Sequence, residues 1–322
     1  MKIARLFQAL IPRPGLSIVL WKLAAAVLLA LLLFTAVHHT DIAELARMMT
    51  HIQLRSMLPL VLLQGLTLLM STWLWSRPLS YIGTAPFSGL RHFTEIFRIN
   101  SAASLMESIT PSSKLGGESM KLLLIKQYTG QKASSLLAVM VMHKIIVLLP
   151  VILLAGISFT FLPLRHSIVL PIAAPGFYQI ALLLAALVVF FVFSPVLVRR
   201  IRTLRATVRT SLLAELLAVS LLMWLCYPLK YYLAAAILHI SIPFQAVILA
   251  TLGAYCVSLV PISPGGLGSF ELTMAFLLQS SGLSFEEGLL IAGIGRLITF
   301  WLPLAVSAAV AASYMCVQPI KA

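Results

Sequence analysis

The chain contains six apolar segments that are each long enough to cross a lipid bilayer as a helix. A crossing helix needs about 20 predominantly apolar residues. The six segments run at about 16–37, 57–76, 133–160, 174–198, 212–238 and 287–313. Only 10% of the residues are charged, against about 25% in soluble domains, so there is too little polar side chain to cover a water-facing surface. The sequence therefore predicts an all-α polytopic membrane protein with six full transmembrane helices.

Two further apolar stretches, residues 93–128 and 244–281, are each interrupted near the middle. The first contains the sequence PSSKLGG and the second contains SPGGLGS. Such interruptions occur at membrane depth only where protein or a water-filled cavity satisfies the freed backbone groups. Each half is also short for a separate crossing. We therefore expect two re-entrant or broken-helix hairpins beside the six full spans.

The distribution of basic residues predicts the topology. The chain carries 23 Lys and Arg against 9 Asp and Glu. With the N-terminus inside, the basic residues outside are Arg47, Arg55 and Arg165, and those within apolar segments are Lys144, Lys230 and Arg296. The other 17 lie inside. Because Lys and Arg concentrate on the cytoplasmic side of membrane proteins, we expect both termini in the cytoplasm, with the protein in a prokaryotic inner membrane.

The positive charge does not indicate a nucleic-acid partner. The basic residues cluster between segments of membrane-spanning length, and no DNA- or RNA-binding motif accompanies them. The densest cluster consists of Arg199, Arg200, Arg202, Arg205 and Arg209. We expect this cytoplasmic loop to bind anionic lipid headgroups.

The two interrupted stretches belong to an internal repeat. Pro111, Glu118 and Pro150 correspond to Pro264, Glu271 and Pro303, each 153 residues on, and Gly130 and Lys144 correspond to Gly282 and Arg296, each 152 residues on. Repeat 1 covers about 14–160 and repeat 2 about 172–315 of a single domain, residues 1–322. Three spans separate equivalent points, so the copies face opposite ways across the membrane. Inverted repeats with interrupted helices are typical of alternating-access transporters.

The sequence SPGGLGSFE in the second hairpin is the sharpest local motif. Pro264 ends one helix, and Gly265, Gly266 and Gly268 permit backbone conformations that other residues avoid. The free N–H groups of the following helix then form a candidate site for an anion such as a phosphate. The alternative is a tight turn that only allows close helix packing.

Charged residues within the apolar segments are the other candidates for a substrate-binding or gating site. Glu118 and Glu271 follow the two breaks, where each could cap its helix or pair with Lys144 or Arg296 of the same repeat. Charges at membrane depth usually face a partner or a water-filled cavity. A structural pair and a substrate-binding pair both fit these residues. Further candidates in the apolar segments are Glu107, His143 and Lys230.

No catalytic motif of a hydrolase or transferase accompanies these residues. The sequence has no GxSxG, HExxH or DxD pattern, and its nine acidic residues offer few candidates for a metal site. We therefore expect neither an enzyme nor a bound cofactor or metal.

The segment SLVPISPGGLGSFELTMAFLLQSSGLSFEEGLLIAGIGRLITFWLPL resembles the lysylphosphatidylglycerol synthase transmembrane region, the flippase-like family. The matching positions are Pro264, Gly265, Gly266, Gly268, Glu271, Gly282, Arg296, Trp301 and Pro303, and TPSSKLGGESMKLLLI is similar to the family's N-terminal counterpart. The resemblance implies a membrane protein that handles lipids. We expect no aminoacyltransferase domain in this chain, and hence no synthase activity.

Three functions fit these observations. The leading hypothesis is a flippase that moves a phospholipid, glycolipid or polyprenyl-type lipid with an anionic headgroup between leaflets by alternating access. One alternative is a secondary transporter of a small anionic solute, and another is a non-transporting partner of a lipid-modifying enzyme. A lipid transporter requires a lateral opening between spans, whereas a small-solute carrier requires a closed vestibule.

Overall fold

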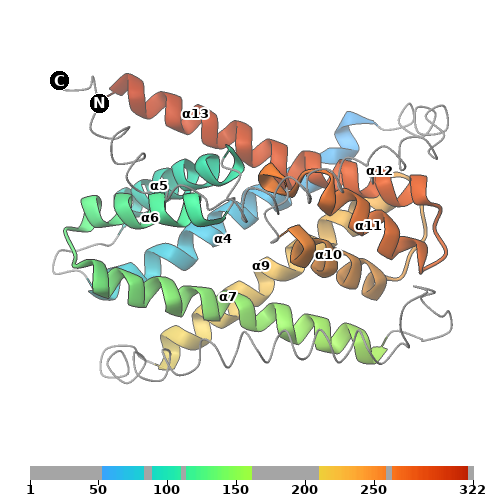
Figure 1. Ribbon diagram of the computed structural model, residues 1–322, viewed down its shortest axis with the longest axis horizontal. Helices are drawn as coiled ribbons and strands as arrows, with labels where there is room; N and C mark the ends of the chain where they lie inside the picture. Colours follow the sequence, from blue (N-terminus) through green and yellow to red (C-terminus); the bar gives the residue numbers. More distant parts are fainter. Residues whose placement is uncertain (1–52, 83–88, 110–113, 162–209, 259–262, 318–322) are drawn as a thin grey trace, which may run out of the picture.

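The computed structural model describes residues 53–82, 89–109, 114–161, 210–258 and 263–317, and these residues are helical without a strand (Figure 1). The elements are η1 (Leu54–Met57), α4 (Leu58–Ile82), α5 (Leu90–Ile109), α6 (Lys114–Thr129), α7 (Ala133–Phe161), α9 (Thr210–Ile237), α10 (Phe244–Ser258), η2 (Pro264–Gly266), α11 (Ser269–Gln279), α12 (Phe285–Arg296), η3 (Leu297–Trp301) and α13 (Leu302–Val317). The predicted all-α fold class is confirmed for this part of the chain.

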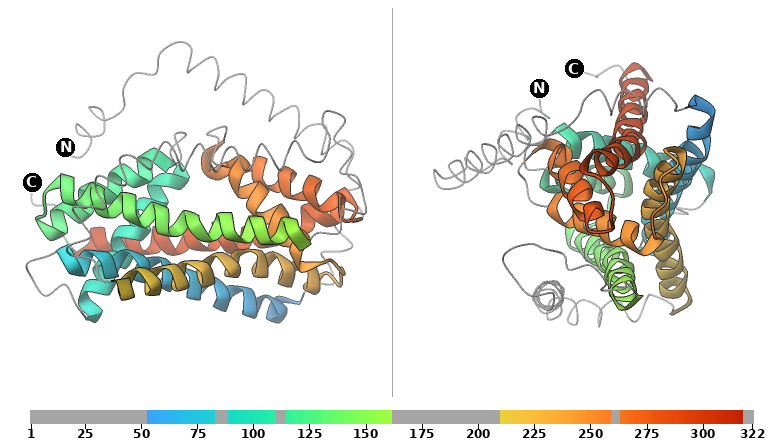
Figure 2. Two further views of the ribbon diagram at one scale, coloured as in Figure 1. Left: turned by 90° about the horizontal axis from the view of Figure 1, so that it is seen from below. Right: turned by 90° about the vertical axis from the view of Figure 1, so that its right-hand side faces the viewer.

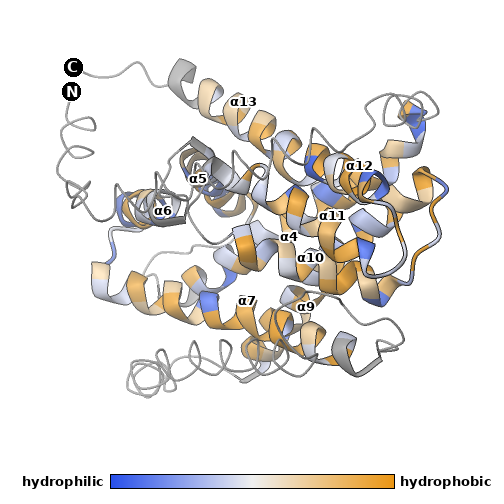
Figure 3. Ribbon diagram, turned by 45° about the vertical axis from the view of Figure 1, so that its right-hand side comes forward, coloured by the Kyte–Doolittle hydropathy of each residue, from blue (hydrophilic) through white to orange (hydrophobic). Residues whose placement is uncertain are grey.

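Four helices of the described residues are long and apolar enough to cross a membrane. They are Leu54–Ser80, Ala133–Ser158, Ser211–Ile237 and Phe285–Ser313. Each coincides with one of the predicted spans, and hydrophobic residues line most of α7 and α9 (Figure 3). The other two predicted spans, 16–37 and 174–198, lie outside the described residues, as does the predicted arginine-rich loop. The count of six therefore remains a prediction.

Each interrupted stretch forms a pair of packed helices. Helix α5 packs against α6, and α10 packs against α11. None of these four helices is among those long and apolar enough to cross a membrane. The two pairs lie toward opposite ends of the long axis, along which α4, α7 and α9 extend (Figure 2). The tip of the second pair, η2, contacts α5, so the pairs meet between these ends.

The predicted break PSSKLGG is shorter than expected. Residues from Lys114 onward, including the two glycines, already belong to α6. A Cβ atom on Gly117 would lie 2.8 Å from the Ala103 carbonyl oxygen and 2.9 Å from the Glu107 Cβ atom. The glycine therefore serves close packing of α6 against α5 and does not break the helix. Glu118 consequently lies beyond the first turn of α6, so its predicted role as a capping residue is wrong.

The last predicted span is one continuous helical run that contains a short π-helical segment in its middle. Helix α12 ends at Arg296, η3 is a π-helical segment, and α13 continues from Leu302. Pro303 has no N–H to donate and its ring crowds the carbonyl group four residues earlier. A wider π-helical turn relieves this crowding, and such turns are frequent at functional sites.

Each helix pair packs against its own hydrophobic core. The core around α5 and α6 contains Trp75, Ile96, Ile125, Leu136 and Val139. A larger core around α10, α11 and α12 contains Tyr231, Val247, Phe270, Met274 and Ile291. These two cores hold the hairpins in place beside the long helices.

The close approach of α5 and α6 predicts a cost for Gly117→Ala. The added methyl group overlaps backbone atoms of α5, and overpacking of this kind costs about 1–3 kcal/mol. Gly156→Ala in α7 is the matched control, because no atom lies within 4 Å of its added Cβ and alanine favours a helix by up to about 1 kcal/mol. The free energy of unfolding in mixed micelles measures both. Equal stability of the two variants would contradict the packing described for Gly117.

Candidate functional site

Both ion pairs predicted from the repeat are present. The Lys144 Nζ atom lies 2.5 Å from a Glu118 carboxylate oxygen, and the Arg296 Nε atom lies 2.9 Å from a Glu271 carboxylate oxygen. Their environments differ. The Lys144 side chain is 54% exposed, whereas that of Arg296 is only 7% exposed. The first pair is therefore accessible and the second is enclosed.

The Arg296 guanidinium group joins two parts of the second hairpin, η2 and α11, to the helical run that follows it. Its Nε atom donates to Glu271 on α11, and its Nη2 atom donates to the Gly265 carbonyl oxygen of η2 at 2.7 Å. The guanidinium carbon also lies 4.9 Å from the ring centre of Phe270 and 4.5 Å from that of Phe300. The arrangement binds the tip of the hairpin to the end of α12 from several sides.

The turn formed by residues 264–268, the glycine turn, requires its glycines. Gly265, Gly266 and Gly268 have φ values of 62°, 69° and 80°, as the sequence predicts for glycines in conformations that other residues avoid. A Cβ on Gly265 would lie 2.3 Å from the Phe300 ring. Pro264 begins the short helix η2 in this turn.

The glycine turn also bears on the predicted anion site at the start of α11. The Gly268 N–H donates to the second Glu271 carboxylate oxygen at 2.7 Å, so Glu271 caps its own helix as predicted. An N–H group that an incoming anion would need is thus already bonded. In this conformation the turn and the Arg296–Glu271 pair form a closed network, which favours the structural interpretation of that pair.

A polar cavity of about 270 Å³ lies beside the first ion pair. It is enclosed by α4, α5, α6, α9, η3 and α13. The lining residues are Gln64, Thr67, Leu68, Ser71, Thr72, Phe97, Asn100, Ser101, Ala103, Ser104, Glu107, Gly117, Glu118, Lys121, Tyr227, Thr299, Pro303 and Ser307. The cavity therefore brings together the first hairpin and the π-helical segment of the second repeat.

Several polar groups of this cavity have no partner in the part of the chain that the structure describes. The side-chain amide of Asn100 and the Oε2 atom of Glu118 are buried without a hydrogen bond. The Glu107 carboxylate and the Lys121 ammonium group have neither a hydrogen bond nor an ion pair among these residues. Since polar groups at membrane depth usually have partners, these four groups make the cavity a candidate binding site.

The Lys230 side chain adjoins the same cavity. It is fully buried, and its Nζ atom donates to Gln64 Oε1 at 2.5 Å and to Thr67 Oγ1 at 3.1 Å. The ammonium group also lies 4.4 Å from the centre of the Tyr227 ring. All three partners line the cavity. The lysine therefore holds the side chains of Gln64 and Thr67 in place at the wall of the cavity.

His143 lies behind the other side of the cavity. Its ring stacks on Trp75 at a centroid distance of 4.1 Å, and the Lys121 Nζ atom lies 4.4 Å from the Trp75 ring centre. Neither ring nitrogen of His143 has a hydrogen-bond partner among the described residues. The histidine thus packs against the same tryptophan ring that lies beside the Lys121 ammonium group.

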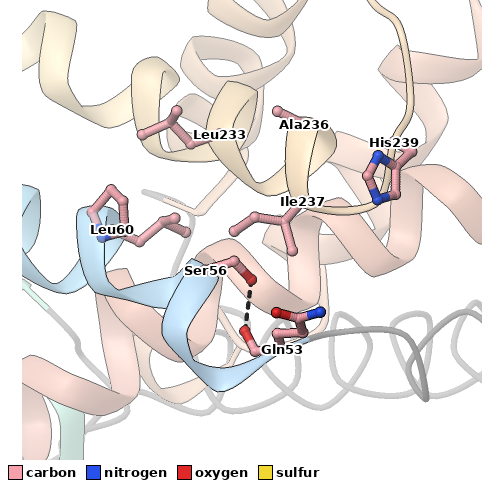
Figure 4. Close-up of a pocket in the computed structure, with 8 residues that line it drawn as sticks. Gln53, Ser56, Leu60, Leu233, Ala236, Ile237 and His239 are labelled. Carbon is pink, nitrogen blue, oxygen red and sulfur yellow. Dashed lines mark hydrogen bonds between the residues drawn. The ribbon is translucent and has the colours of Figure 1, made fainter.

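A larger cavity of about 380 Å³ lies where α4 and α9 approach each other near Gln53 and His239 (Figure 4). Its other lining residues are Ser56, Pro59, Leu60, Leu233, Ala236 and Ile237. No Lys, Arg, Asp or Glu lines it, and none of the residues predicted from the sequence belongs to it. The polar cavity is therefore the stronger candidate despite its smaller volume.

Asn100 and Lys121 are not among the site residues predicted from the sequence, although a helical pattern leads to Asn100. Asn100, Ser104 and Glu107 are spaced at i, i+4 and i+7, and therefore share one face of α5. Gln64, Thr67 and Ser71 share a face of α4 in the same way. Polar stripes on otherwise apolar helices are thus the signal for this cavity.

The closed network around Arg296 predicts a large effect of removing its charge. Arg296→Gln leaves Glu271 enclosed without its cation, which costs about 3–5 kcal/mol in free energy of unfolding. Arg296→Lys keeps the positive charge but lacks the planar guanidinium group, so the stability of this variant should lie between those of the wild-type protein and R296Q. The control is Arg98→Gln, because Arg98 is exposed and pairs with the half-buried Glu95, so its cost should stay within about 1 kcal/mol. Unfolding by SDS in mixed micelles measures the stability of each variant. Equal stability of R296Q and R98Q would contradict the network.

Comparison with known proteins agrees with the resemblance noted from the sequence. The family model described as lysylphosphatidylglycerol synthase TM region matches residues 19–307. A UPF0104 membrane protein of Methanothermobacter thermautotrophicus is 34% identical over 102 residues, which cover 32% of this chain and 30% of that protein. A UPF0104 membrane protein of Pyrococcus horikoshii is 22% identical over 235 residues, which cover 62% of this chain and 70% of that protein. The chain is an integral membrane protein that belongs to the lysylphosphatidylglycerol synthase transmembrane-region family.

Proposed function

We propose that this protein is a lipid flippase that moves a lipid with a phosphate-bearing headgroup between the two leaflets. The observation that carries the proposal is the polar cavity, which presents unpartnered polar groups among helices of membrane-spanning length. Its volume of about 270 Å³ is near the lower limit of ligand pockets, roughly 300 Å³. A headgroup fits such a space while the acyl chains remain in the bilayer.

The outer surface of the helices agrees with a lipid environment. Large apolar side chains are exposed along α4 and α7, among them Leu62, Leu66, Leu69, Leu149 and Leu153. Such a surface is stable in contact with acyl chains and unfavourable in water. The exposed leucines of α4 and α7 thus fit helices that face the hydrocarbon of the bilayer.

The proposed mechanism is alternating access between two inverted repeats. The contacts between helices support the repeat, because α5 packs on α13 of the second half while α10 packs on α7 of the first. Likewise α4 contacts α5 as α9 contacts α10, and α4 and α9 contact each other. The opposite positions of the two hairpins along the long axis support their inverted insertion (Figure 2).

The difference between the two ion pairs suggests which half is closed. The network of Arg296, Glu271, Gly265 and Gly268 holds the second hairpin shut, whereas the Glu118–Lys144 pair is accessible beside the polar cavity. In the opposite state the two hairpins would exchange these roles. Arg296 and Glu271 then act as a gate, and the glycine turn provides the backbone freedom for the change.

The flippase proposal predicts that Lys121→Gln slows lipid movement. A hydrogen bond to a charged group contributes about 1.5–3 kcal/mol, so loss of the contact between Lys121 and the phosphate should reduce the rate at least about tenfold. Proteoliposomes with lipids labelled on an acyl chain, and dithionite quenching of the outer leaflet, measure this rate. Lys126→Gln, an exposed lysine on the same helix, is the control and should keep the wild-type rate.

Three results distinguish the alternatives. Wild-type protein that moves no labelled lipid beyond protein-free liposomes would contradict flippase activity. Uptake of a small anion without lipid movement would instead support the solute transporter. Lipid movement that K121Q and K126Q leave equally unchanged would remove the polar cavity from the mechanism.

A further inference from the structure

Two of the charged residues that line the polar cavity form no ion pair among the described residues. Glu107, Glu118 and Lys121 line it, and Glu118 is already paired with Lys144. Among the described residues this leaves one carboxylate, Glu107, and one ammonium group, Lys121, which form no ion pair although their charges attract each other. The cavity thus offers a ligand one negative and one positive group.

The two groups come from different helices. Glu107 lies on the face of α5 that also carries Asn100, whose buried amide has no hydrogen-bond partner among the described residues. Lys121 lies on α6, and its ammonium group lies over the ring of Trp75 in α4. Because Gly117 lets α5 and α6 pack closely, both groups face one small space. A ligand that carries only a phosphate would satisfy Lys121 but would meet repulsion from Glu107.

We propose that the polar cavity recognises a headgroup that carries one phosphate and one primary ammonium group, as in an ethanolamine phospholipid. This inference rests on the proposed flippase function and names its class of substrate. The Lys121 ammonium group binds the phosphate. The Glu107 carboxylate and the Asn100 carbonyl oxygen accept hydrogen bonds from the substrate ammonium group, and the Asn100 NH₂ group is available to the phosphate.

The lining also distinguishes a primary ammonium group from a trimethylammonium group. A choline headgroup has no N–H to donate, and its recognition depends on several aromatic faces. Only Phe97 and Tyr227 of the lining residues are aromatic, and the Tyr227 face already lies against Lys230. The cavity therefore favours hydrogen bonding to N–H groups over an aromatic cage.

The test compares three acyl-chain-labelled lipids in proteoliposomes: phosphatidylethanolamine, phosphatidylglycerol and phosphatidylcholine. Wild-type protein should move phosphatidylethanolamine about tenfold faster than the other two. Glu107→Gln should remove most of this preference, with a slower rate for phosphatidylethanolamine and an equal or faster rate for phosphatidylglycerol. Glu95→Gln on the same helix is the control, because Glu95 pairs with Arg98 away from the cavity, and it should keep the wild-type preference.

A second measurement does not depend on the variants. Thermal stability of the wild-type protein in detergent should rise with O-phosphoethanolamine and not with inorganic phosphate. A rise with O-phosphoethanolamine in a protein that moves no lipid would support this headgroup chemistry while contradicting the flippase proposal. Equal movement of phosphatidylethanolamine and phosphatidylglycerol by wild-type protein would overturn the inference and leave the flippase proposal intact. An equal rise with both phosphates would also overturn it.

Discussion

The cost of an unpaired charge inside a membrane is the constraint on which the rest of this structure depends. Even on scales derived from insertion experiments, a charged side chain at mid-bilayer costs about 2.5–3.5 kcal/mol. The second hairpin meets this constraint internally, since Arg296 bonds to Glu271 and Gly265 between two aromatic rings. The first hairpin meets it only in part, because Glu107 and Lys121 have no ionic partner among the described residues.

This difference between two similar halves connects structure to the proposed transport. A network in which an arginine, a capping glutamate and two positive-φ glycines bond to one another has few ways to relax without separating entirely. Such a two-state element is what a gate requires. The accessible pair Glu118–Lys144 bonds through one contact, so a ligand can replace it at smaller cost. A closed network in the second hairpin and an accessible cavity at the first would then correspond to one state of the proposed transport cycle.

Much of the architecture could be predicted because the membrane restricts the choices. Segment length alone identifies the four spans that the structure describes, and rare charged residues at a fixed offset identify both ion pairs. The start of α6 at Lys114 could not be predicted, since the role of Gly117 depends on contact with Ala103 on another helix. Asn100 and Lys121 gain their importance from a cavity formed by six elements, and no local pattern specifies which polar faces meet.

A structure of the protein in nanodiscs that contain phosphatidylethanolamine tests the central claim most directly. We expect density for a lipid headgroup inside the polar cavity, with its phosphate at Lys121 and its acyl chains extending between helices into the bilayer. The density should disappear in K121Q and remain in K126Q. A cavity that contains no headgroup, with lipid bound only on the outer surface of the helices, would contradict the account.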